Sequence, residues 1–300
     1  MFPLNHRLRS LILLALLAAS SARGQYDDDP PISLGDSSVG YIDSALTGNQ
    51  ARVRFDAGYD INKPNRSEFL WGWPTGRGPA LDESRADYQS ITAYIERALT
   101  EDSSIFFEVP LMFSNPTVID NTAGLGDLQI GWKKALAQTH DAVLTFQLRT
   151  HLPTGDADRT LGTGHVSLEP GLLLHRRLGE GWNWESEFRY WIPLDGEPDR
   201  QGGVLRYGAG VSRSLLLEEL RITPVVEMVG WTALAGQSRF LDDSLAPVTE
   251  DAAGDTIVNL KVGARLAGVG RDELYVGYGR ALTEERWYQD ILRVEWRYKY

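Results

Sequence analysis

The chain of 300 residues carries a formal net charge of −11 and contains no cysteine, and its length suits one large domain or two ordinary ones. Without cysteine there is no disulfide framework, no thiolate metal site, no cysteine nucleophile and no lipid anchor on cysteine. The acidic balance argues against nucleic acid as a partner, because nucleic-acid binding needs a basic surface.

Residues 1–22 have the composition of a signal peptide. A basic start precedes an apolar stretch over residues 11–19, and residues 20–22 are small, as a cleavage site requires. The apolar stretch is too short to cross a bilayer as a helix. We therefore expect cleavage after Ala22, or alternatively after Gly24, and export of the mature chain across an inner membrane.

Residues 23–49 are polar, contain two adjacent prolines and show little alternation. We expect them to form either a periplasmic tail or a plug segment inserted into the following domain, and the sequence leaves both open. Acidic runs at 27–29 and 242–243 offer oxygen ligands that suit a hard cation. Exposed acidic runs are more often solvated, and the histidines lack a metal-binding spacing, so we predict no metal site.

From residue 50 to residue 300, apolar and polar residues alternate with a period of two, which indicates β-strands. In the first segment, apolar residues at the odd positions from 51 to 61 alternate with mostly charged residues at the even positions. Later segments repeat this pattern, although at 87–99 and 221–234 either face could be the apolar one. We place about twelve strands at residues 50–62, 87–99, 104–114, 126–136, 142–152, 164–178, 182–193, 203–216, 221–234, 256–267, 272–281 and 288–300.

Long and short connections alternate between these segments, and aromatic residues gather near the segment ends. Both features are typical of a transmembrane β-barrel, which has short turns at one rim, long loops at the other and aromatic girdles at the membrane interfaces. The predicted fold is therefore all-β: a transmembrane antiparallel β-barrel over residues 50–300, in the outer membrane of a two-membrane (Gram-negative-type) bacterium. The alternative is a secreted β-sandwich or a soluble lipocalin-like barrel, which has the same period.

Three short stretches, at 124–134, 152–155 and 162–165, resemble the pattern of a known family. The pattern is a G-x-G-D strand start, a hairpin and then a P-x-G loop that feeds a glycine-opened strand. It is similar to that of the outer-membrane transporter barrels grouped with the MetA-pathway phenol-degradation proteins. The resemblance implies an outer-membrane location and passage of small, often hydrophobic compounds. From the residues alone, these glycines, Asp127 and Pro153 supply turn chemistry.

The last strand carries Trp296, Tyr298 and Tyr300 on one face, with Tyr300 as the final residue. This arrangement is similar to the C-terminal signal that the barrel-assembly machinery reads. We therefore expect that machinery and outer-membrane lipid as partners.

Charged residues on the polar strand faces are predicted to line the lumen, where they need water or opposite charges as neighbours. They are Arg52, Arg54, Asp56, Glu108, Lys133, Arg149, Glu169, Glu185, Glu187, Arg189, Lys261, Arg265, Arg293, Glu295, Arg297 and Lys299. Because basic residues outnumber acidic ones in this set, we expect a slightly anion-favouring or zwitterion-tolerant channel. Alternatively, the same charges could pair with one another and form a plug that lets little pass through the lumen.

The loop between the first two strands carries the aromatic residues Phe69, Trp71 and Trp73. Exposed aromatic residues in a long loop either fold inward or contact a partner. We expect a constriction loop over the lumen, and packing among the external loops is the alternative.

The predicted function is passive or facilitated passage of small molecules, including hydrophobic or aromatic cargo. The alternative is a non-transporting structural or adhesive barrel. A third reading is a barrel hydrolase that uses His165 and Ser167, with Asn183 as the nearest amide to orient the histidine. The strand parity places both residues in the lumen, whereas a barrel lipase needs them to face lipid. We therefore predict no enzyme activity, and no cofactor, because phosphate- and dinucleotide-binding motifs are absent from the sequence.

Overall fold

The computed structural model describes residues 37–62, 78, 81, 83, 85–194, 202–241, 244, 246–268 and 270–300. The predicted signal peptide at 1–22 and the acidic runs at 27–29 and 242–243 lie outside the described residues, as do Phe69, Trp71 and Trp73.

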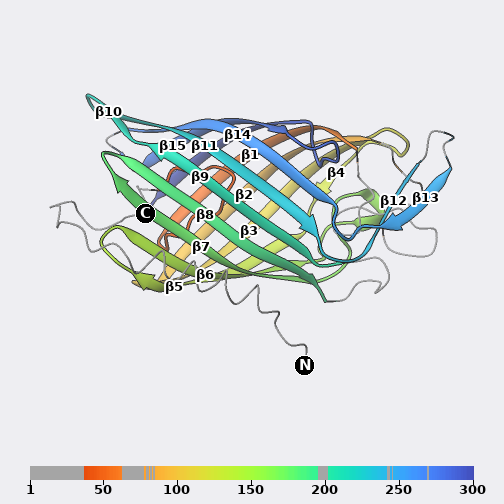
Figure 1. The fold of residues 1–300 in the computed structure, drawn as a ribbon, viewed down its shortest axis with the longest axis horizontal. Helices are drawn as coiled ribbons and strands as arrows, with labels where there is room; N and C mark the ends of the chain where they lie inside the picture. The colour runs from red at the N-terminus through yellow and green to blue at the C-terminus, as the bar shows by residue number, and fades with distance from the viewer. Residues whose placement is uncertain are drawn as a thin grey trace.

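The chain is all-β, and twelve antiparallel strands close into a barrel in which the first strand pairs with the last (Figure 1). They are β1 (Gln50–Ile61), β2 (Ala86–Thr100), β3 (Ser103–Pro116), β5 (Leu128–Gln138), β6 (Ala142–Leu152), β7 (Ser167–Gly179), β8 (Trp182–Pro193), β9 (Val204–Arg213), β11 (Leu220–Ala233), β14 (Thr256–Ala267), β15 (Asp272–Ala281) and β16 (Asp290–Lys299). Among the described residues, no helix is long and apolar enough to cross a membrane. The prediction of a twelve-stranded antiparallel barrel is confirmed.

Four short strands extend the barrel at its rims. β4 (Thr122–Leu125) pairs with β3, and β10 (Leu215–Leu217) pairs with β11. β12 (Gln237–Leu241) and β13 (Pro247–Asp251) form a separate hairpin inside a connection that we expected to be a plain loop. This hairpin forms because the backbone N–H and C=O groups of so long a connection need hydrogen-bond partners within the connection.

Most expected strand boundaries lie within two residues of the observed ones, and two of them differ by three residues, for local reasons. The strand expected from residue 164 begins at Ser167, because the preceding residues belong to a loop that is bound to Asp127. The strand expected to run to residue 216 breaks after Arg213, where the Ser214 amide donates to the carbonyl of Gly181 in the neighbouring turn.

The two rims of the barrel differ, as Figure 1 shows, with β10 at one end and β4, β12 and β13 at the other. Two-residue turns at 101–102, 180–181 and 218–219 lie at the first rim. Glu180 and Glu218 there adopt positive φ values of 50° and 54°, as tight hairpin turns require. In the first of these turns the Lys134 ammonium donates a hydrogen bond to the Asp102 carboxylate and lowers the pKa of that group.

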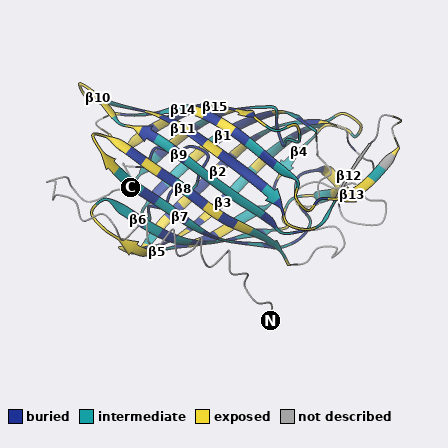
Figure 2. Cartoon of the chain, viewed as in Figure 1, coloured by how far each residue is buried: buried dark blue, intermediate teal, exposed yellow. Residues whose placement is uncertain are grey.

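The register of β1 with β16 explains which residues face inward. Val53 lies opposite Trp296, and Arg54 lies opposite Glu295, so apolar and charged pairs alternate along the two strands. Val53 is 45% exposed and Asp56 is 5% exposed, which puts the apolar side chains on the outer surface. The same alternation of buried and exposed residues continues around the barrel (Figure 2).

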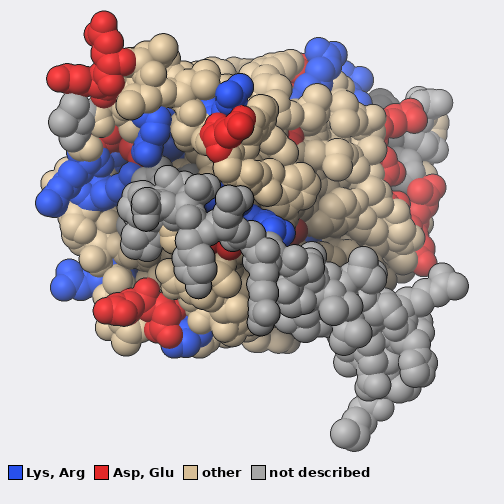
Figure 3. All heavy atoms as spheres, turned by 60° about the vertical axis from the view of Figure 1, so that its left-hand side comes forward, with Lys and Arg blue, Asp and Glu red and all other residues tan. Residues whose placement is uncertain are grey.

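An apolar outer surface on every strand suits lipid, because a closed barrel satisfies all of its strand hydrogen bonds internally. In Figure 3 most of the visible wall belongs to uncharged residues, and charged side chains stand around the ends of the barrel.

We expect Val276→Arg, in the middle of β15, to lower the free energy of unfolding in lipid vesicles by about 2–4 kcal/mol, because its exposed side chain faces the bilayer centre. Urea titration followed by tryptophan fluorescence measures the change. Leu216→Arg on β10 at the rim is the matched control, with an expected cost of about 0–1 kcal/mol. An equal loss of unfolding free energy at the two positions would contradict the placement of the outer surface of β15 against lipid.

Two strands with unclear parity, β2 and β11, carry apolar side chains on the inner face as well. Tyr94 on β2 is buried, and so are Val225, Val229 and Trp231 on β11. The three β11 residues belong to a cluster of buried apolar residues inside the barrel, which also includes Val39 and residues of the β15–β16 connection. The barrel interior is therefore partly an apolar core.

Candidate functional site

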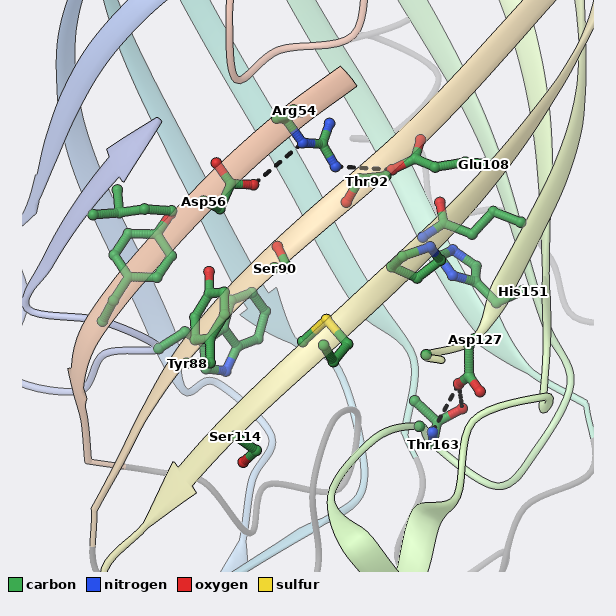
Figure 4. A pocket seen from close by; sticks show the side chains of 18 of the residues that line it. Arg54, Asp56, Tyr88, Ser90, Thr92, Glu108, Ser114, Asp127, His151 and Thr163 are labelled. Atoms are coloured by element: carbon green, nitrogen blue, oxygen red, sulfur yellow. Dashed lines mark hydrogen bonds and ion pairs between the residues drawn. The ribbon is translucent and has the colours of Figure 1, made fainter. Parts of the chain in front are cut away.

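The charged residues that the strand parity placed in the lumen lie on the inner side of the wall. Arg52 and Arg54 are half-buried, and the others are buried except Lys299, which is half-buried near the rim. Figure 4 shows Arg54 of β1 between Asp56 of the same strand and Glu108 of β3, with β2 between the two strands.

These charges form ion pairs that run around the wall. Arg293 binds Asp56 through two hydrogen bonds of 2.6 and 2.8 Å, and Arg54 lies 2.8 Å from Glu108. Each pair joins different strands, so the side chains hold one another in place across the sheet. A buried pair gives little net stability, but the loss of one partner leaves an uncompensated charge.

The strand parity missed three inward carboxylates, those of Glu96, Glu227 and Glu273. Glu96 and Glu227 lie on β2 and β11, where the apolar residues on both faces hid the pattern, and Glu273 is the second residue of β15. With these carboxylates, the basic and acidic residues of the interior are close to balance. The charge count therefore gives no reason to expect a strong preference for anions.

The inner segment, residues 37–46, lies inside the barrel and is held there by inward carboxylates. The Glu227 carboxylate accepts three backbone N–H bonds, from Gly40, Tyr41 and Ile42, at 2.9–3.1 Å. The Glu185 carboxylate accepts from the amide of Ser38, at 3.0 Å. Each of these buried carboxylates therefore satisfies backbone groups that have no strand partner.

Guanidinium groups bind the carbonyl groups of the same segment. Arg206 donates to the carbonyl of Tyr41 at 2.7 Å, and Arg265 donates to that of Val39 at 2.8 Å. The Asp43 carboxylate lies 2.6 Å from Arg149 and 2.9 Å from Arg189. The inner segment therefore replaces water as the partner of many interior charges.

The wall is shaped around the inner segment. A Cβ atom at Gly210 of β9 would lie 3.3 Å from Val39 and 3.4 Å from Ile42, and one at Gly208 would lie 3.2 Å from Ile42. A Cβ atom at Gly40 itself would lie 2.2 Å from the ring of Tyr275. Larger side chains at these glycines would displace the inner segment.

Beyond the inner segment, on the side of the long loops, the barrel encloses a cavity of about 390 Å³. Tyr41 and Asp43 of the inner segment are part of its lining, and Figure 4 shows the strands that contribute the rest. The lining combines charged side chains with aromatic and apolar ones, among them Tyr88, Trp191, Trp231, Trp287, Tyr288, Met112 and Ile291. Its volume lies within the range of small-molecule sites.

Asp127, from the glycine-rich motif, performs the turn chemistry expected of it. Its carboxylate accepts from the Gly155 amide at 3.0 Å and from the Thr163 amide at 2.7 Å, which fixes the P-x-G loop beside the cavity (Figure 4). A Cβ atom at Gly162 would lie 2.3 Å from this carboxylate, so the close approach depends on glycine.

The geometry around His165 and Ser167 does not form a catalytic dyad. The Ser167 hydroxyl is buried and has no hydrogen-bond partner among the described residues, and His165 Nδ1 lies 3.0 Å from the carbonyl oxygen of Thr163. Ser167 pairs with Pro193, whereas Asn183 pairs with Arg177 toward the other rim. Along β8, Asn183 lies roughly 30 Å from Pro193, at about 3.3 Å per residue, so Asn183 cannot orient the histidine.

The predicted assembly residues lie at the end of β16, at the rim with short turns. Trp296 and Tyr300 are exposed, and the rings of Trp296 and Tyr298 stack at 6.2 Å between centroids. Recognition by the barrel-assembly machinery stays a prediction. Within the part of the chain that the structure describes, no group of three or more His, Asp or Glu side chains is placed to hold a metal ion.

Comparison with known proteins agrees with this architecture. Residues 97–289 match a family model described as "Putative MetA-pathway of phenol degradation". The COG4313 outer membrane channel from Pseudomonas putida F1 is similar over 87% of this chain and 98% of its own, with a TM-score of 0.55 and 14% identity. The NanC porin matches over 83% of this chain and all of its own (100%), with a TM-score of 0.50 and 9% identity. No curated protein sequence matches the chain.

Proposed function

Because the chain belongs to the MetA-pathway phenol-degradation family and folds as a closed barrel with an apolar outer belt, we propose that it is an outer-membrane channel for small molecules. The observation that carries this proposal is the cavity of about 390 Å³ inside the barrel. Its lining offers both ion-paired polar groups and aromatic rings, which suits small cargo with hydrophobic or aromatic parts. Passage is passive or facilitated, since nothing in the proposal requires an energy source.

The inner segment determines how wide the path through the barrel lumen is. Tyr41 and Asp43 lie between the cavity and the rim with short turns, and their neighbours are bound to the wall by buried hydrogen bonds. We therefore propose that residues 37–46 act as a plug that leaves only a narrow path. Larger cargo then requires a displacement of this segment.

One observation favours the alternative of a non-transporting structural barrel. Most of the interior charges are paired with one another or with the inner segment, so a fully closed lumen is compatible with these contacts. A hydrolase function has no such support, because in the part of the chain that the structure describes the Ser167 hydroxyl makes no hydrogen bond to a base.

Single-channel recording of the refolded mature protein in planar bilayers, under a salt gradient, tests the proposal. We expect discrete steps of small conductance with weak ion selectivity, because the path is narrow and the interior charges nearly balance. Heat-modifiable migration on a gel controls for correct folding. If correctly folded barrels showed no conductance, the result would support a non-transporting structural barrel. A strong preference for cations or anions would contradict the balance of interior charges.

A further inference from the structure

We propose that Lys261 and the aromatic side chains around it form a subsite that binds the carboxylate of a small aromatic acid. The inference rests on the proposed channel function and adds a substrate class and the residues that recognise it. It starts from the charge of Lys261, which lies on β14, lines the cavity and is only 3% exposed.

Among the described residues, Lys261 has no carboxylate within ion-pair distance, although it is buried. Its ammonium donates one hydrogen bond, to the Tyr288 hydroxyl at 2.7 Å. The other cations of this part of the lining are paired: Arg293 binds Asp56, and Arg206 lies 2.7 Å from Glu187. A buried ammonium with free N–H groups is costly unless an anion completes its shell.

The nearest carboxylate in the sheet register is that of Glu227, which lies opposite Lys261 on β11. Its oxygens accept the three backbone N–H bonds of the inner segment, and it also accepts a hydrogen bond from the Tyr275 hydroxyl at 3.3 Å. Glu227 is therefore committed to holding the inner segment. The ammonium of Lys261 remains available to a ligand in the cavity.

Aromatic rings surround the ammonium and define the shape of the subsite. The Lys261 Nζ atom lies 3.9 Å from the ring centroid of Tyr41, 5.2 Å from that of Tyr288 and 5.4 Å from that of Trp231. Trp231 and Trp287 meet edge to face, with centroids 4.7 Å apart. These rings offer flat apolar walls that suit a second aromatic ring.

The chemistry of the donors selects a carboxylate. The Tyr288 hydroxyl accepts from Lys261, so its own proton is free to donate, and the two groups together present two donors to one carboxylate. One unpaired positive charge matches one negative charge, whereas a phosphate or sulfate would bring more charge than the apolar walls accommodate. The aromatic ring of the ligand would then pack against Trp231 and Trp287.

The wall also leaves room for this lysine. A Cβ atom at Gly279 of β15 would lie 2.8 Å from Cγ of Lys261 and 2.9 Å from Ile291. The glycine therefore lets the lysine stem lie flat beside Ile291, which directs the ammonium toward Tyr288.

Isothermal titration of the refolded mature protein with benzoate tests the proposal. We expect saturable binding by the wild type, and a loss of affinity of about tenfold or more in Lys261→Met, because a charge-assisted hydrogen bond is removed. Benzyl alcohol, which has the ring without the charge, should bind equally to both proteins. Lys134→Met is the matched control, since it removes one positive charge at the exposed rim and should leave benzoate binding unchanged.

Tyr288→Phe keeps the ring and removes only the hydroxyl, so it tests the subsite even if Lys261→Met folds poorly. We expect its affinity for benzoate to fall about threefold to tenfold. Equal benzoate affinity in wild type, Lys261→Met and Tyr288→Phe would overturn the proposal, and so would the absence of benzoate binding by the folded wild type. In both cases discrete conductance would show that the channel proposal survives without this subsite.

Discussion

Deletion of residues 37–46 from the mature chain should raise the single-channel conductance of the refolded barrel by about threefold or more. A barrel of twelve strands has a lumen too wide for the wall side chains alone to fill, so removal of the inner segment leaves open space. The inner segment contributes the backbone atoms that Glu227, Arg206 and Arg265 bind. Without it these charges face water, which hydrates them and opens a continuous path from the cavity to the rim. Planar-bilayer recording under the conditions used for the wild type measures the change.

A deletion of equal length at residues 27–36 is the matched control, because it leaves the contacts of the inner segment in place. Its conductance should equal that of the wild type. If the two deletions gave the same conductance as the intact protein, the inner segment would not be the barrier, and the external loops would have to restrict the path.

The substitution Lys133→Met should lower the free energy of unfolding by about 3 kcal/mol, because it leaves a buried carboxylate without its cation. Lys133 and Glu96 are both buried, and their charged atoms lie 3.2 Å apart. Glu96 keeps neutral donors from Tyr94 and Ser104, which cannot replace the lost charge. Urea titration in lipid vesicles measures the cost.

The double variant Lys133→Met/Glu96→Gln should recover more than half of that cost, because it removes both charges and keeps the shape of the pair. The neighbouring Lys134→Met is the control, since the ion pair of Lys134 with Asp102 is exposed and screened by water, so its loss should change the free energy of unfolding far less. A double variant less stable than Lys133→Met alone would show that Glu96 does not depend on the lysine.

The sequence predicted the strands well wherever one face met lipid and the other met charge. β1 and β16 are such strands, and their period of two fixed both the position and the orientation of residues such as Arg54 and Glu295. β2 and β11 were ambiguous because their inner faces pack against an apolar cluster. That cluster depends on Val39 and Ile42, which precede the barrel in the chain.

The sequence predicted which charged residues face the lumen, but it could not predict which of them contact one another. Lys261 was identified from strand parity, but its lack of a carboxylate depends on Glu227 being bound to the inner segment, which is a long-range contact. Trp287 lies in a loop, where no periodicity assigns a direction to a side chain, and Tyr288, which was expected in the last strand, lies in the same loop because β16 begins at Asp290. The hairpin of β12 and β13 was missed because its strands are short.

The inner segment is recognised mainly through its amides and carbonyls, and this has an evolutionary consequence. Substitutions at Ser44 or Leu46 leave the contacts of Glu227, Arg206 and Arg265 intact, because those contacts involve main-chain atoms. Substitutions at such positions are therefore tolerated, whereas Val39, Tyr41 and Ile42 are constrained by buried packing, Gly40 by the ring of Tyr275 and Asp43 by its ion pairs. Two homologues with different residues at Ser44 and Leu46 could still have the same backbone path through the pore.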